Sequence, residues 1–253
     1  MRVFIILMLA CFSVCINAQN DTVFNEGNTL YNQGKYAEAI KKYEALLDKN
    51  EHAVALYFNL ANAHYKLNNI APSVYYFEKA KLLSTDDKDI ENNLVFAQNM
   101  TVDAIDTFPE VGFSRIFKNI VNTFSSDSWA KLAISGILVF VLFFLLYHFT
   151  SATSQKRVAF VISVLGFLVA VFSLVIAFQK NNLEIKNNPA IVFAQESKVK
   201  ADPNNTSEEV FRLHEGTKVQ VLESYENWCK IEIADKTTGW IPSEDVKLLK
   251  FFR

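Results

Sequence analysis

The sequence predicts a multidomain protein with all-α helical-repeat hairpins, two transmembrane helices and a small all-β barrel. Three observations support this fold class. Residues 20–104 are rich in helix formers and repeat with a period of 34 residues. Two runs of about 20 apolar residues follow, each long enough to cross a bilayer. Residues 189–250 then hold several short β-patterned runs separated by turn-forming residues.

The N-terminus has the pattern of a secretory signal peptide over residues 1–18. Arg2 precedes the apolar run 3–16, and Ala18 is the expected last residue removed. The run is too short to span a membrane comfortably. Lipidation at Cys11 and retention as an uncleaved anchor are the two alternatives.

Residues 130–149 and 158–178 are predicted to be transmembrane helices. The alternative is a pair of buried core helices, but neither run shows a polar face. The loop between them, 150–157, ends in Lys156-Arg157, and short basic loops stay in the cytoplasm. Both flanking domains are therefore expected on the opposite side, which agrees with the signal peptide.

Residues 111–125, just before the first span, are predicted to form an amphipathic helix. Apolar residues recur at helical spacing from Phe113 to Phe124, and Arg115, Lys118 and Asn122 occupy the other side. Such a helix either lies on the membrane surface or packs against the repeat domain.

The 34-residue period defines two helical hairpins between residues 20 and 104. The segment from Gly27 through Gly34 and Tyr36 to Tyr43 resembles the tetratricopeptide repeat. In the second copy Asn68 replaces the turn glycine, and asparagine tolerates a left-handed backbone. A fifth helix over 89–99 is expected to cap the array.

The resemblance implies that the first helix of each repeat lines a concave groove for a peptide-like partner. The groove residues that it implies come from both repeats: Phe24, Asn28, Tyr31, Asn32, Phe58, Asn62, Tyr65 and Lys66. The alternative is that the aromatic residues and Asn28 and Asn62 only pack against neighbouring helices.

The predicted strands of the C-terminal domain cover 190–193, 197–200, 218–223, 228–234 and 239–241. Strand alternation places Cys229 in the core. The Glu215-Gly216-Thr217 turn and the Gly239-Trp240-Ile241 element resemble a bacterial SH3 domain. That resemblance implies a ligand face, unless both tryptophans belong to the barrel core. Its candidate residues are Asp202, Glu215, Trp228 and Trp240.

Composition and motifs argue against catalysis. The chain carries 25 basic and 27 acidic residues, so it lacks the basic excess of a nucleic-acid-binding protein. No phosphate-binding glycine loop and no paired Cys or His spacing for a metal is present. We therefore expect an interaction protein rather than an enzyme, with no cofactor, no metal site and no catalytic residue.

The order of segments resembles, along the whole chain, the BatE family of the Bacteroides aerotolerance operon. Residues 101–103, 108–109 and 124–129 add to the match. The resemblance implies a multi-pass protein of the bacterial inner membrane with both terminal domains in the periplasm. It also implies protein partners, among them von Willebrand-type A domain proteins of the same operon, in aerotolerance or envelope stress. A second candidate partner is peptidoglycan, bound through the SH3 domain.

Overall fold

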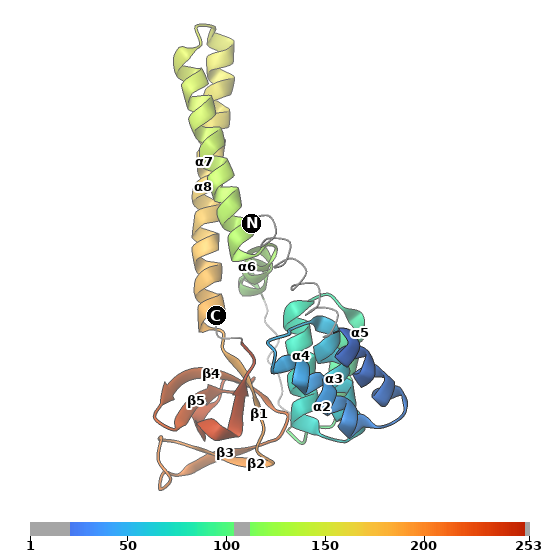
Figure 1. Ribbon diagram of the computed structural model, residues 1–253. Helices are drawn as coiled ribbons and strands as arrows, with labels where there is room; N and C mark the ends of the chain where they lie inside the picture. The colour runs from blue at the N-terminus through green and yellow to red at the C-terminus, as the bar shows by residue number, and fades with distance from the viewer. Residues whose placement is uncertain (1–20, 104–111, 251–253) are drawn as a thin grey trace, which may run out of the picture. The chain divides into compact units, whose positions relative to one another are not determined.

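The computed structural model describes residues 21–103 and 112–250, which divide into two compact units (Figure 1). One unit contains the helical repeats together with the C-terminal β domain. The other contains the apolar helices, which lie between these two domains in the sequence. The predicted signal peptide, 1–18, lies outside the described residues. The predicted fold class is confirmed in its three components, and the β domain differs in one respect given below.

The repeat domain consists of a helix over 21–32 and four further helices, which pair as the 34-residue period predicts. They are α2 (Tyr36–Leu47), α3 (Val54–Lys66), α4 (Ile70–Leu83) and α5 (Lys88–Gln98). Gly34 and Asn68 occupy the two matching turns with φ of 77° and 59°. The left-handed backbone expected at Asn68 is thus confirmed, because both turns require positive φ.

Large and small side chains alternate in the core of the repeats, as the motif requires. Gly27 lies so close to Tyr43 that a Cβ atom there would be 2.5 Å from the tyrosine ring. Tyr43 itself is fully buried with Ala39 and Leu60. The predicted cap, α5, buries Ile90, Leu94 and Ala97 as expected, and the carboxylate of its N-cap Asp87 accepts hydrogen bonds from the next turn.

The second unit contains α6 (Phe113–Asn122), α7 (Ser126–Phe149) and α8 (Thr153–Lys186). By length and composition, α7 and α8 can cross a membrane. Small residues let them pack closely: a Cβ atom on Gly136 would be 2.9 Å from the Gly166 carbonyl oxygen. Most of their large apolar side chains face outward.

The two helices are longer than the predicted spans. Helix α7 begins at Ser126 and α8 at Thr153, so the predicted loop 150–157 is helical from Thr153 onward. Helix α8 also continues beyond residue 178, through residues 179–186, to Lys186. The segment contains no Gly or Pro, and Lys180 pairs with Glu184 one turn later at 3.8 Å. Pro189, two residues beyond the C-cap Asn187, begins the first strand.

The C-terminal domain is a single antiparallel sheet of seven strands. In chain order these are β1 (Pro189–Val192), β2 (Glu196–Lys200), β3 (Glu209–His214), β4 (Lys218–Tyr225), β5 (Trp228–Glu232), β6 (Thr238–Pro242) and, after the 3-10 turn η1 (Ser243–Asp245), β7 (Val246–Leu248). The spatial order is β3-β2-β6-β5-β4-β1-β7.

The predicted barrel is therefore an open, curled sheet, because its end strands β3 and β7 do not pair with each other. The prediction also missed these two strands. Cys229, Ile231 and Ile233 are all buried, so the predicted inward face of β5 is confirmed. The thiol of Cys229 lies inside the core, as expected for a structural cysteine.

Candidate functional site

Three surfaces of the first unit bear on function: the groove of the repeats, the outer face of the β sheet, and the joint between the two domains. We define the domain joint by the residues that meet across it. From the repeat domain these are Ile70, Val74, Tyr75, Glu78, Thr101 and Asp103. From the β domain they are Ile191, Phe193, His214, Gly216, Thr217, Lys218, Leu248 and Leu249.

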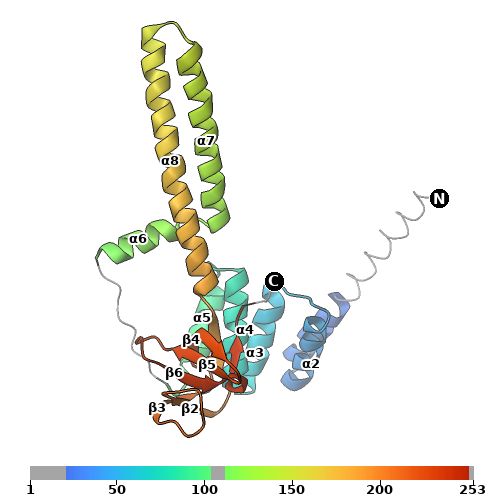
Figure 2. The ribbon, with the colours of Figure 1, turned by 90° about the vertical axis from the view of Figure 1, so that its left-hand side faces the viewer.

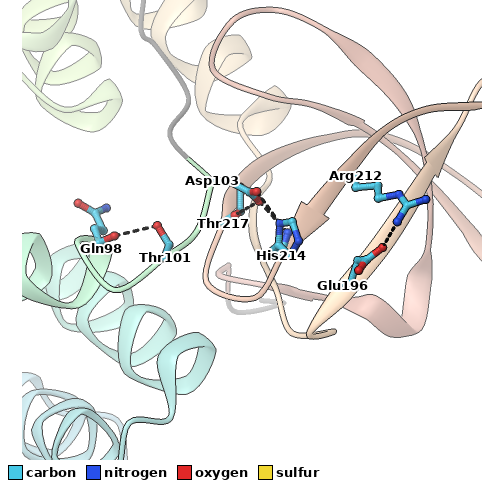
Figure 3. A network of polar contacts seen from close by, with 7 residues as sticks. All are labelled: Gln98, Thr101, Asp103, Glu196, Arg212, His214 and Thr217. Atoms are coloured by element: carbon cyan, nitrogen blue, oxygen red, sulfur yellow. Dashed lines mark hydrogen bonds and ion pairs between the residues drawn. The ribbon is translucent and has the colours of Figure 1, made fainter.

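The polar centre of the domain joint is the carboxylate of Asp103. It accepts hydrogen bonds from the His214 backbone N–H at 2.7 Å, the His214 Nδ1 at 2.7 Å and the Thr217 hydroxyl at 2.6 Å (Figure 3). Burial opposes ionisation of Asp103, but these donors outweigh it and lower the pKa of the carboxyl below its usual range. The carboxylate thus holds the turn before β4, residues 214–217, against the C-terminal end of the repeat domain.

An ion pair with one buried partner and a tyrosine add to the polar contacts. Lys218 Nζ lies 2.8 Å from Glu78 Oε2, and the Glu78 side chain is only 6% exposed. The Tyr75 hydroxyl donates to the Leu248 carbonyl oxygen at 3.2 Å. Beside them, burial and the nearby charge of Lys247 lower the pKa of Lys79 to about 8. Removal of Lys218 would leave the buried Glu78 carboxylate without this partner, so the ion pair contributes to holding the domains together.

The apolar part of the joint is continuous with the core of the repeats. Ile191 and Leu249 are fully buried in the same cluster as Val74 and Phe77 of α4. Phe193 meets the Tyr75 ring edge to face, with centroids 5.5 Å apart. A shared core of this kind makes the two domains one packed body.

Gly216 allows the turn before β4 to approach the repeat domain closely. Its φ is 87°, and a Cβ atom there would lie 2.7 Å from Thr101 Cγ2 and 2.9 Å from Ile70 Cγ2. Sequence reasoning assigned no role to Asp103, Glu78 or Lys218. The only signal was the Glu-Gly-Thr turn itself, which contains the glycine that the joint requires.

The predicted groove residues lie on the first helix of each repeat, but most are engaged in packing. Asn28 accepts hydrogen bonds from the Tyr43 hydroxyl at 2.8 Å and from Asn59 Nδ2 at 2.9 Å. Asn62 donates to the Phe58 carbonyl oxygen of the preceding turn at 2.9 Å. Both side-chain amides therefore already make hydrogen bonds within the repeat domain.

The aromatic members of the groove set are half-buried. Phe24 lies against Tyr43, Tyr31 against Tyr36, and Phe58 against Phe77, with ring centroids 5.9, 5.2 and 5.8 Å apart. Tyr65 packs beside the buried cluster around α4. Only Asn32 and Lys66 of the eight are exposed, so they are the members best placed to meet a partner.

The β-domain candidates separate into different places. Trp228 and Trp240 lie outside the buried core cluster, on the outward side of β5 and β6, and both are half-buried. Trp240 contacts the Tyr225 ring and lies under the Lys230 ammonium, 5.9 Å from its ring centroid. Glu215 instead belongs to the turn at the domain joint.

Trp228 also lines a surface pocket of about 430 Å³. The other lining residues are Asn205, Asn227, Pro242, Ser243 and Glu244. Asp202 begins the loop that carries Asn205. One aromatic wall, two amides, a hydroxyl and a carboxylate suit a polar, uncharged or cationic ligand. Sequence reasoning found Trp228 but not its polar neighbours, because they come from three separate loops.

No metal centre is formed by the described residues: within 21–103 and 112–250, no group of three or more His, Cys, Asp or Glu is placed to hold an ion.

Comparison with known families identifies both domains. Residues 24–87 match the tetratricopeptide repeat model, and residues 197–247 match the bacterial SH3 domain model. No curated protein matches the chain. Domains of both types are typically non-catalytic and bind other molecules. The chain therefore combines a tetratricopeptide-repeat domain with a bacterial SH3 domain, separated in sequence by two helices that are apolar enough to cross a membrane.

Proposed function

We propose that the protein is a membrane-anchored periplasmic scaffold that mediates protein–protein interaction. The observation that carries this proposal is the domain joint. Segments on the two sides of the apolar hairpin fold into one compact unit, so the repeats and the SH3 domain present their surfaces together. Once one surface holds a ligand, the other meets its own ligand at a raised effective concentration.

The domain joint also bears on membrane topology. Two domains that share a core must lie on the same side of any membrane that the intervening helices cross. An even number of spans between them, α7 and α8, satisfies that condition. Lys156 and Arg157 near the start of α8 favour the cytoplasm for the connection, which leaves the periplasm for the joined domains.

The resemblance to the BatE family supplies the proposed partners. They are other products of an aerotolerance operon, including von Willebrand-type A domain proteins, assembled in a complex that acts in oxygen or envelope stress. A tetratricopeptide-repeat domain supports the coarser statement that at least one partner is a protein. No catalytic or cofactor role is proposed.

Protease added to intact spheroplasts tests the topology. Both terminal domains are expected to be digested while a cytoplasmic control protein survives. Protection of either domain, with a periplasmic control digested, would overturn the proposal.

Crosslinking in native membranes tests the groove. Asn32→Ala with Lys66→Ala removes exposed groove side chains without touching the amides that pack the fold. We expect a several-fold loss of crosslinked protein partners. The matched control is Lys41→Ala with Glu44→Ala, two exposed residues of α2. Equal capture by both double variants would exclude the groove as the partner site.

A second candidate function is binding of peptidoglycan, which the pocket beside Trp228 favours. Its aromatic wall and its amide and hydroxyl groups offer stacking and hydrogen bonds to a glycan or its peptide. The detergent-solubilised full chain should sediment with purified sacculi, and Trp228→Ala should reduce the bound fraction several-fold. Sedimentation that Trp228→Ala leaves unchanged would remove this pocket from consideration.

A further inference from the structure

Helix α6 carries an apolar face that the second unit leaves exposed. Ile116 is 58% exposed, Ile120 is 40% exposed, and Phe124 in the following turn is 48% exposed. Phe117 lies on the same face. Residues at i, i+1 and i+4 share one side of a helix, as Ile116, Phe117 and Ile120 do, and Phe124 follows the C-cap Thr123. Arg115 and Lys118 lie on the other side, and the helix contains no acidic residue.

The same helix is fixed to the base of the apolar hairpin by one turn. Val121 is 1% exposed and packs in a cluster with Trp129, Ile176 and Ala177. The Trp129 indole N–H donates to the Val121 carbonyl oxygen at 3.3 Å. Lys180 Nζ donates to Asn122 Oδ1 at 2.7 Å. The position of α6 is therefore set by the hairpin.

These contacts place α6 at the level where the hairpin changes from apolar to polar. Ile176 and Ala177 belong to the last apolar turn of α8, and Gln179 and Lys180 follow directly. Figure 2 shows α6 extending to one side of α8, across the direction of the α8 axis, rather than continuing along it. If α7 and α8 span a bilayer, a helix attached at this level and running across them lies along the membrane surface.

We propose that α6 is an interfacial helix that lies in the headgroup region of the bilayer. Ile116, Phe117, Ile120 and Phe124 face the acyl chains, and the basic side faces the phosphates. The contacts between Val121 and Trp129 hold α6 to the hairpin, so the depth of α6 in the headgroup region sets how deeply the hairpin inserts into the bilayer. We call α6 in this role the collar. This inference rests on the membrane anchoring contained in the proposed function.

Lipid is the occupant that the chemistry favours. The face is continuous with a hairpin whose own apolar side chains point outward, so one apolar medium covers both. The cationic side of the helix complements anionic headgroups. A partner protein or a second copy of the chain on this face would be a different outcome of the same test.

Spin labels on single introduced cysteines test the proposal in the full chain. The protein is reconstituted in vesicles of phosphatidylethanolamine and phosphatidylglycerol, and collisions with oxygen and with a water-soluble nickel chelate are compared. Labels at Ile116→Cys and Ile120→Cys are expected to meet oxygen and to exclude the chelate. A label at Asn119→Cys, on the polar side of α6, is expected to meet the chelate readily. The unsubstituted protein, treated in the same way, gives the background signal from labels on its own cysteines.

Leu138→Cys, exposed in the middle of α7, separates failure of the collar from failure of the anchoring. If Leu138 is lipid-exposed while Ile116 and Ile120 meet the chelate, the collar is overturned and the anchoring stands. If all three meet the chelate, the anchoring itself is wrong. Exclusion of both reagents at Ile116 and Ile120 would show a protein on this face, and would also overturn the proposal.

Discussion

Replacing Asp103 by alanine should loosen the domain joint. The carboxylate accepts three hydrogen bonds and its side chain is 13% exposed. A hydrogen bond to a charged group contributes about 1.5–3 kcal/mol, and bonds to one group are not additive. We therefore expect Asp103→Ala to weaken docking by about 2–4 kcal/mol, or roughly 30-fold to 1000-fold in the closed-to-open ratio.

Hydrogen exchange of the full chain in nanodiscs measures this change directly. The backbone N–H of His214 donates to Asp103, so its exchange should accelerate when the carboxylate is removed. Thr217→Val deletes one hydrogen bond and keeps the branched shape, so a smaller acceleration is expected, equivalent to about 1 kcal/mol. Asp86→Ala, at an exposed carboxylate on the same domain, is the matched control.

Exchange of the amides of residues 214–217 at the parent rate in Asp103→Ala would refute this role of the carboxylate. Equal acceleration in Asp86→Ala would refute it too, because the effect would then follow from charge rather than from the joint. Far-UV circular dichroism of each variant separates opening of the joint from unfolding of either domain.

Three further predictions concern stability. Gly216→Ala should destabilise the first unit by about 1–3 kcal/mol in a thermal unfolding assay, because residue 216 has a positive φ and its Cβ atom would contact the other domain. Gly34→Ala is the control: φ is also positive there, but the space around it is open, so the loss of stability should be smaller. Burial and the charge of Lys247 lower the pKa of His64 to about 4. Between pH 6.5 and 4 the unfolded chain therefore binds a proton at this histidine, whereas the folded chain keeps it neutral. The free energy of unfolding should fall by about 2–3 kcal/mol as the pH drops from 6.5 to 4. His64→Phe should flatten that slope in denaturant titrations, and an unchanged slope would assign it to other groups. Gly136→Leu should lower the melting temperature of the hairpin in detergent by separating α7 from α8, whereas Ser135→Leu, at an exposed position, should not.

Local periodicity determined most of the architecture. The 34-residue repeat, the two apolar runs and the strand alternation around Cys229 each depend on neighbours close in sequence, and each prediction agreed with the structure. Strand β7 was missed because it has only three residues. Strand β3 was missed because it lies at the edge of the sheet and only Leu213 of it is buried, while the adjacent apolar residues Val210 and Phe211 hide the alternation. Whether the sheet closes depends on how its ends meet, which no strand pattern records.

Only the tertiary structure decided what joins the domains. Asp103 and His214 are 111 residues apart in the chain, with the whole hairpin between them. Nothing in the sequence near either residue marks the other, because a hydrogen bond of this kind depends on where two folded domains bring their surfaces. The sequence by itself determined which domains and helices are present, whereas the packing of Ile191 and Leu249 onto α4 decided that two of these domains act as one body.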